Sequence, residues 1–117
     1  MLRNRFLIFI IILFISNNIN AGFASKNNAG NKLYKKGKYP EALKKFTASQ
    51  IDNPESPLLH NNMGNVYYKQ KQLDKALEEY NKALAIKDKN KREQTLYNIG
   101  NVYFKMNKFD LSLYWLS

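Results

Sequence analysis

The sequence predicts an all-α protein: a solenoid of about three helix–turn–helix units, the last one incomplete, preceded by a signal peptide. Two observations carry this prediction. Similar segments begin at Gly30, Gly64 and Gly100, so the pattern recurs after 34 and then 36 residues, a period typical of stacked helix–turn–helix units. The N-terminus differs from these units because it joins two arginines to an uninterrupted apolar run. Stacked units bury their apolar faces against one another and leave a groove, in which we expect the function to lie.

Each unit combines a glycine with a small residue 12 positions later and a large apolar residue four positions beyond. These residues are Gly30, Ala42 and Phe46; Gly64, Ala76 and Tyr80; and Gly100, Ser112 and Leu116. Glycine inside a helix costs about 1 kcal/mol relative to alanine. We therefore expect each glycine to lie where two helices cross closely, facing the alanine or serine of the second helix.

Short turns are expected between the two helices of each unit. The left-handed position that often ends a helix falls at Gly37, Lys71 and Asn107, where lysine is the poorest choice. Residues suited to the first turn of the second helices follow at Pro40, Asp74 and Asp110. Segment 52–57 contains two prolines and is expected to separate the first unit from the second.

With these features the chain resembles the tetratricopeptide repeat (TPR) family. The second unit matches the family pattern best, with Met63, Gly64, Tyr67, Ala76, Tyr80 and Ala83. The resemblance implies a right-handed solenoid with units at 25–56, 57–92 (including a linker) and 93–117, the last truncated. It also implies that the first helix of each unit lines the concave surface.

The N-terminal 24 residues are predicted to be a signal peptide. Arg3 and Arg5 precede ten apolar residues, 6–15, and cleavage is expected after Ala21 or Ala24. Ten residues span only about 15 Å as a helix, against about 30 Å for a bilayer core. We expect an exported, periplasmic or otherwise extracytoplasmic protein. The alternative is an uncleaved inner-membrane anchor, in which case this segment alone contacts the membrane.

Residues suited to catalysis are sparse. The chain has no cysteine and one histidine, His60, which is expected to pack between helices. A zinc site would need further nitrogen or sulfur ligands. We therefore expect no catalytic residues, metal or cofactor.

A candidate peptide-binding groove comes from polar residues that recur on the first helices with the spacing i, i+3, i+7. They are Asn28, Asn31 and Lys35; Asn62, Asn65 and Lys69; and Asn98, Asn101 and Lys105. This spacing puts each set on one helix face. An asparagine amide both donates and accepts hydrogen bonds, so successive units could pair with the backbone of an extended peptide. Tyr34, Tyr68 and Phe104 could form the groove floor. The alternative is a set of solvated helix faces in an asparagine-rich chain.

Some TPR co-chaperones grip the acidic C-terminus of a heat-shock chaperone with asparagine and basic side chains. Asn31 and Asn62 fill the asparagine positions here, but the three basic positions hold Asn27, Gln94 and Asn98. This departure argues against a carboxylate clamp.

The expected function is a non-enzymatic interaction module of the bacterial cell envelope, which binds an extended peptide or a helix. Segments 30–39, 53–57 and 60–65 resemble TPR members of bacterial aerotolerance (Bat) operons. That resemblance implies partners with von Willebrand A-type domains and a role in oxygen or stress tolerance. Two alternatives stay open. The net charge of +10 suits a surface-binding protein for anionic lipid or wall polymer, and the chain could be the N-terminal part of a larger envelope scaffold. Nucleic acid is not an expected partner of an exported protein.

Overall fold

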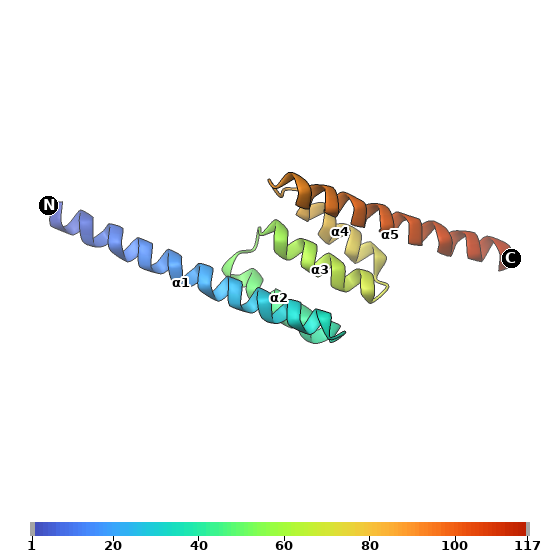
Figure 1. The fold of residues 1–117 in the computed structure, drawn as a ribbon, viewed down its shortest axis with the longest axis horizontal. Helices are drawn as coiled ribbons and strands as arrows, with labels where there is room; N and C mark the ends of the chain where they lie inside the picture. The colour runs from blue at the N-terminus through green and yellow to red at the C-terminus, as the bar shows by residue number, and fades with distance from the viewer. Residues whose placement is uncertain (1, 117) are drawn as a thin grey trace.

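The computed structural model describes the backbone of residues 2–116 and the side chains of residues 3–12 and 21–108. Within these residues the protein consists of five helices and no strands (Figure 1). The helices are α1 (Leu2–Lys35), α2 (Tyr39–Asp52), α3 (Pro57–Lys69), α4 (Leu73–Ala83) and α5 (Lys89–Leu116). The predicted all-α solenoid is thus confirmed.

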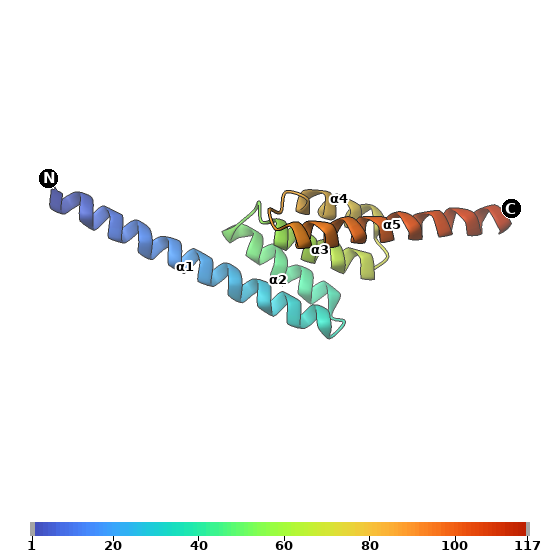
Figure 2. The ribbon, with the colours of Figure 1, turned by 45° about the horizontal axis from the view of Figure 1, so that its top comes forward.

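The helices stack as successive pairs. The C-terminal part of α1 packs against α2, α3 packs against α4, and α5 lies against α4 (Figures 1 and 2). The molecule measures 77 × 28 × 20 Å because the start of α1 and the end of α5 project beyond the stack in opposite directions. The first helices of the three units are therefore α1, α3 and α5.

Two apolar clusters fill the spaces between the helices. One contains the buried residues Ala42, Phe46, Leu59, Met63 and Val66. The other contains Ala76, Tyr80 and Val102. The half-buried ring of Tyr67 packs against both clusters. The two clusters therefore form one continuous core through the stack, as expected of repeats that pack against their neighbours.

In the first two units the turns and the starts of the second helices lie where the sequence predicts them. Gly37 and Lys71 have positive φ angles of 74° and 61°, the conformation expected at those positions. Ser56 precedes α3, and its hydroxyl accepts a hydrogen bond of 3.3 Å from the backbone N–H of Leu59. This side chain satisfies one of the free N–H groups at the start of the helix.

The glycines of the first two units lie at close helix crossings, and the atoms nearest to them belong to aromatic rings rather than to the predicted alanines. A Cβ added to Gly30 would lie 2.5 Å from the ring of Phe46, and one added to Gly64 would lie 2.6 Å from the ring of Tyr80. The space that glycine leaves is thus occupied by the aromatic residue 16 positions later. Ala42 and Ala76 are instead fully buried within the core clusters.

The third unit differs from the prediction. Helix α5 continues without a break through Asn107 and Asp110, so the expected turn and second helix are absent from the described residues. Gly100 is exposed, and a Cβ placed there would meet no atom within 4 Å. A continuous helix keeps the backbone hydrogen bonds that a turn would break. The side chains of Ser112 and Leu116 lie outside the described residues.

The N-terminal segment joins the first unit without a boundary in the backbone, since α1 runs from Leu2 to Lys35. Phe23 packs against the first core cluster, and its carbonyl oxygen accepts a hydrogen bond from the Ser49 hydroxyl. Lys26 forms an ion pair of 2.9 Å with Asp52. These contacts place the start of the folded unit near residue 23. No helix in the part that the structure describes is both long and apolar enough to cross a membrane.

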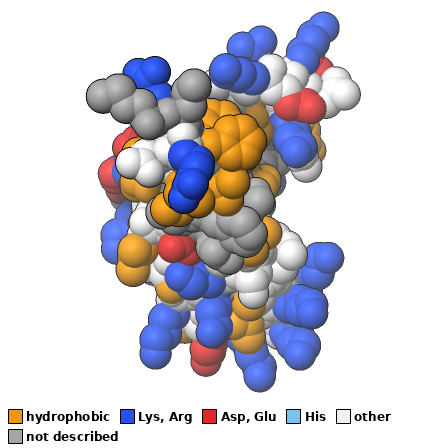
Figure 3. Space-filling model, turned by 90° about the vertical axis from the view of Figure 1, so that its left-hand side faces the viewer, with side chains coloured by type: hydrophobic (Ala, Val, Ile, Leu, Met, Phe, Trp, Pro, Cys, Tyr) orange, Lys and Arg blue, Asp and Glu red, His pale blue; other side chains and the backbone are white. Residues whose placement is uncertain are grey.

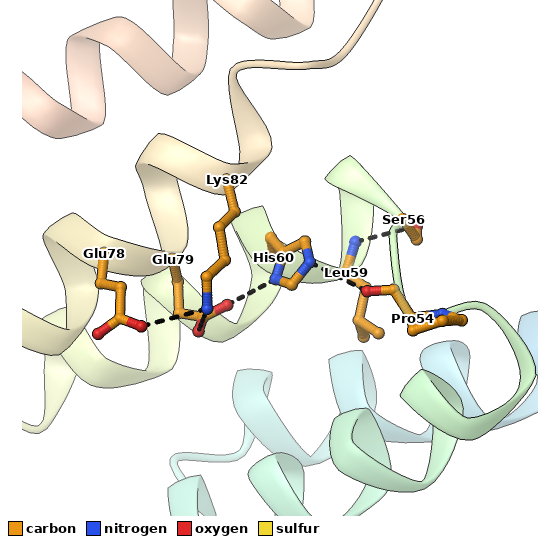
Figure 4. A network of polar contacts seen from close by, with 7 residues as sticks. All are labelled: Pro54, Ser56, Leu59, His60, Glu78, Glu79 and Lys82. Atoms are coloured by element: carbon orange, nitrogen blue, oxygen red, sulfur yellow. Dashed lines mark hydrogen bonds and ion pairs between the residues drawn. The ribbon is translucent and has the colours of Figure 1, made fainter.

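A polar network that is buried at His60 and Glu79 joins α3 to α4 (Figure 4). His60 lies between helices as expected, 5% exposed, with Nδ1 2.6 Å from Glu79 Oε2 and Nε2 3.2 Å from the carbonyl oxygen of Pro54. The His60 ring thus bridges Glu79 of α4 and the segment that precedes α3. Lys82 contacts Glu78 and Glu79 at 3.2 Å, and the bond to Glu78 raises the pKa of Lys82. The network ties the two helices of the second unit together.

Candidate functional site

A hollow of about 160 Å³ lies where the first helices of the three units meet. Its lining residues come from α1, α3, α4 and α5: Tyr34, Asn65, Tyr68, Lys69, Tyr80, Asn98 and Asn101. Their side chains are amides, phenols and one ammonium group. Such a surface can donate and accept hydrogen bonds and stack against flat groups.

The structure brings together four of the nine predicted groove residues. Asn65, Lys69, Asn98 and Asn101 line the hollow. The other five are Asn28, Asn31, Lys35, Asn62 and Lys105, which do not line it. Two predicted residues of α3 and two of α5 are therefore grouped, whereas none of the three predicted residues of α1 lines the hollow.

Several amide side chains on the first helices bond to one another across the repeat boundary. Asn62 donates from Nδ2 to Asn27 Oδ1 over 2.9 Å, and Asn98 donates from Nδ2 to Asn65 Oδ1 over 3.5 Å. The Thr95 hydroxyl bonds to Asn61 Oδ1 over 3.2 Å. These pairs are separated by 33 to 35 residues, which is one repeat. Part of the asparagine pattern thus joins neighbouring units to one another, a role that spacing along a single helix does not reveal.

Tyr80 gives the hollow a polar wall. Its hydroxyl donates to Asn65 Oδ1 over 2.7 Å, and burial raises the pKa of Tyr80. Burial, with a smaller contribution from the adjacent Tyr39, also raises the pKa of Tyr34. Both phenols therefore stay neutral and can donate hydrogen bonds at neutral pH. Sequence reasoning assigned Tyr80 only to packing. The available signal was a tyrosine where the first unit has Phe46.

Aromatic residues of the expected groove floor divide into two groups. Tyr34 and Tyr68 line the hollow, as expected, whereas Phe104 is 59% exposed and lies outside it. Lys105 Nζ lies 4.2 Å from the centroid of the Tyr68 ring, within the range of a cation–π contact. Lys105 therefore stands at the edge of the hollow through its contact with one of the lining rings.

Basic residues outnumber acidic ones and are prominent on the face seen from the start of α1 (Figure 3). Viewed from the end where α1 begins, Lys and Arg side chains project around most of the outline (Figure 3). The sequence has 19 basic and 9 acidic residues. Among the described residues, no group of three or more His, Cys, Asp or Glu side chains is placed to hold a metal ion.

Comparisons with known proteins agree with this architecture. Residues 55–117 match the family described as "Tetratricopeptide repeat", and residues 30–71 match "TPR repeat". RNA polymerase II-associated protein 3 of Gallus gallus is 35% identical over 66 residues, which cover 56% of this chain and 10% of that protein. The chain thus spans about a tenth of the length of this relative.

Among solved structures, the chain is similar to the second TPR domain of Spaghetti (RPAP3), bound to the HSP90 peptide SRMEEVD. The TM-score is 0.67, with 19% sequence identity, and the match covers 80% of this chain and 87% of that one. At this identity the similarity supports the fold. The repeat period, the stacked helix pairs and the matched residues together show that this chain belongs to the tetratricopeptide repeat family.

Proposed function

We propose that this chain is a non-enzymatic binding module that takes an extended segment of another protein across its concave face. One observation carries the proposal: the hollow formed by α1, α3, α4 and α5 groups Asn65, Asn98 and Asn101 with three tyrosines. Amides spaced along adjacent helices suit the alternating N–H and C=O groups of an extended backbone. A volume of about 160 Å³ suits one side chain of the bound segment.

The hydrogen bonds within the site suggest how each amide is used. Asn65 Oδ1 already accepts from Tyr80 and Asn98, so its amide nitrogen is the group available to a carbonyl oxygen of the ligand. Asn101 has no hydrogen bond from its side chain to any other described residue. Its amide therefore offers both a donor and an acceptor, which makes it the most informative residue to test.

The mode of binding should differ from a clamp on a terminal carboxylate. The similar solved domain holds the peptide SRMEEVD. In this chain the basic positions of a carboxylate clamp are amides, and one of them, Asn27, is buried and bonded to Asn62. We therefore propose contacts to the ligand backbone, with Lys69 at the rim, and no dependence on a free C-terminus.

The test begins with peptides selected by the full chain from a phage library of random peptides. Affinity of a selected peptide is then measured by fluorescence anisotropy for the parent chain, Asn101→Ala and Asn28→Ala. Loss of the Asn101 amide should weaken binding about five- to tenfold, since hydrogen bonds contribute about 1 kcal/mol each. Asn28 is exposed and outside the hollow, so it serves as the control. Equal affinities for the parent chain and Asn101→Ala would contradict the proposal, and so would peptides that bind only with a free C-terminal carboxylate.

The cellular setting is also proposed, from the N-terminal sequence. Arg3, Arg5 and the apolar segment 6–15 support export to the bacterial envelope. There the aerotolerance resemblance would supply partners with von Willebrand A-type domains. Residues 1–24 fused to a reporter enzyme that is active only outside the cytoplasm should give activity, and the same fusion lacking residues 6–15 should not. Activity without the apolar segment would argue against export by this signal.

A second candidate function rests on exposed lysines near the turn between α1 and α2. Lys35, Lys36, Lys38, Lys44 and Lys45 are all exposed, and such a cluster attracts anionic lipid or wall polymer. Binding of this kind should be lost in 0.5 M salt, because exposed charges are screened over a few ångströms at high salt. Groove binding should largely persist. Sedimentation with vesicles that contain about one-third anionic lipid, at low and high salt, separates the two functions.

A further inference from the structure

Helix α5 exposes an apolar face whose equivalents in the other two units are half-buried against the core clusters. Leu96, Tyr97, Tyr103 and Phe104 flank Gly100 and are between 51% and 70% exposed. The residues equivalent to Tyr103 and Phe104 are Leu33 and Tyr34 in the first unit and Tyr67 and Tyr68 in the second; all four pack against core clusters. α5 therefore presents the face of a first helix over which no second helix lies in the described residues.

The first two units define what covers this face. In each, the aromatic residue 16 positions after the glycine fills the space over it, as Phe46 does at Gly30 and Tyr80 does at Gly64. The corresponding residue for Gly100 is Leu116, with Ser112 at the small position. Leu116 and Ser112 therefore stand at the same distances from Gly100 as the covering residues of the first two units do from their glycines. The end of α5 has the residues needed to cover such a face.

The same molecule cannot supply that complement in this conformation. Because α5 is one continuous helix from Lys89 to Leu116, residues 100 and 116 are separated by about 24 Å along its axis, at about 1.5 Å per residue. In the first two units the chain reverses at Gly37 and Lys71, which both have positive φ. At the equivalent Asn107 it remains helical.

We propose that a second copy of this chain covers the exposed face, by exchange of the C-terminal part of α5. Two α5 helices would pack antiparallel, with segment 109–116 of each copy over the Gly100, Tyr103 and Phe104 face of the other. The midpoint in sequence between Gly30 and Phe46 is residue 38, and that between Gly64 and Tyr80 is residue 72; the chain turns at both midpoints. The midpoint between Gly100 and Leu116 is residue 108. In the dimer the two-fold axis would pass near this residue, so that Leu116 of one copy meets Gly100 of the other without a turn.

This arrangement is a closed, self-complementary dimer. It leaves the concave hollow open. In the second unit Asn65, which occupies the position of Asn101, lines the hollow although Tyr80 covers Gly64, and Asn98, two residues before Gly100, lies on the opposite side of α5. The inference therefore stands apart from the proposed peptide binding, and either can fail without the other.

Cysteine trapping tests the exchange directly, because the chain has no native cysteine. The full chain carrying Gly100→Cys and Leu116→Cys is oxidised and run on a non-reducing gel. We expect a covalent dimer. A monomer with an internal disulfide would overturn the proposal, because it would mean that the chain folds back on itself. A monomer with two free thiols would overturn it as well. Asn101→Cys with Leu116→Cys is the matched control and should give little dimer, because residue 101 is turned about 100° around the helix.

A second measurement does not depend on cysteine geometry. Sedimentation equilibrium of the full chain should show a monomer–dimer equilibrium whose dissociation constant rises at least about tenfold in Phe104→Ser. Phe104 is exposed in a single copy, so circular dichroism at low concentration should be unchanged. Phe9→Ser, in the exposed N-terminal segment, is the control. If Phe9→Ser weakens association and Phe104→Ser does not, the contact lies in the N-terminal segment and the proposal is wrong.

Discussion

Gly64→Ala tests whether the glycine of the repeat is required by packing. An added Cβ would lie 2.6 Å and 2.7 Å from two ring carbons of Tyr80 and 3.1 Å from a third. The ring has little freedom to move, because Tyr80 is 2% exposed and its hydroxyl is bonded to Asn65. The substitution therefore overpacks the second core cluster rather than filling an empty space.

Two opposing terms set the size of the effect. Alanine gains about 1 kcal/mol over glycine in helix propensity, whereas overpacking costs about 1–3 kcal/mol. We expect a net loss of about 1 kcal/mol in the free energy of unfolding, which corresponds to a fall in Tm of about 4 °C or more for a domain of this size. Urea unfolding followed by circular dichroism at 222 nm measures the change.

Gly100→Ala is the matched control, measured on dilute, monomeric protein. No atom lies within 4 Å of the added Cβ, so only the propensity term applies and stability should rise by about 1 kcal/mol. The difference between the two variants isolates the overpacking cost because the propensity gain is common to both. If the two variants change stability by the same amount and in the same direction, the close crossing at Gly64 does not constrain the sequence, and the reasoning is refuted.

Three further predictions concern the core. Tyr80→Phe should cost about 1 kcal/mol through its lost hydrogen bond. The raised pKa of Tyr80 contributes stability that is fully present below pH 10 and is lost as the pH rises above 10, so Tyr80→Phe should also flatten the alkaline fall seen in urea titrations. Glu79→Ala should lower the free energy of unfolding by about 1–3 kcal/mol, because a buried ring nitrogen of His60 loses its hydrogen-bond partner; an unchanged Tm would show that the network does not stabilise the second unit. A mature chain that begins at Ser25, and therefore lacks Phe23, should be less stable by about 1–2 kcal/mol than one that retains it; equal urea midpoints would contradict the packing of Phe23.

The repeat was predictable because its signals are local and recur. Glycine at a fixed phase, a left-handed turn residue seven positions later and a proline-containing break are each readable from adjacent residues. The structure agrees at Gly37 and Lys71 and at the break between α2 and α3. The turn at Asn107 was predicted by the same logic and is wrong. Asparagine permits a left-handed turn but does not force one.

The candidate site was predictable only in part. Spacing on one helix put Asn98 and Asn101 on one face, and both line the hollow together with Asn65, because helical periodicity depends on that helix alone. It could not show that Asn62 would donate a hydrogen bond to Asn27, 35 residues earlier. Such pairings depend on how two first helices are stacked, and neither helix encodes the stacking by itself.

The sequence alone determined that this chain forms paired helices in a repeating stack, because periodicity, turn residues and small residues act over a few neighbouring positions. Only the tertiary structure decided which side chain fills the space at each glycine, which asparagines join the units and where the hollow opens. Those outcomes depend on the distance and rotation between helices that are far apart in the chain. Phe46 lies over Gly30 and Tyr80 lies over Gly64, whereas no atom of the described residues lies within 4 Å of a Cβ placed on Gly100.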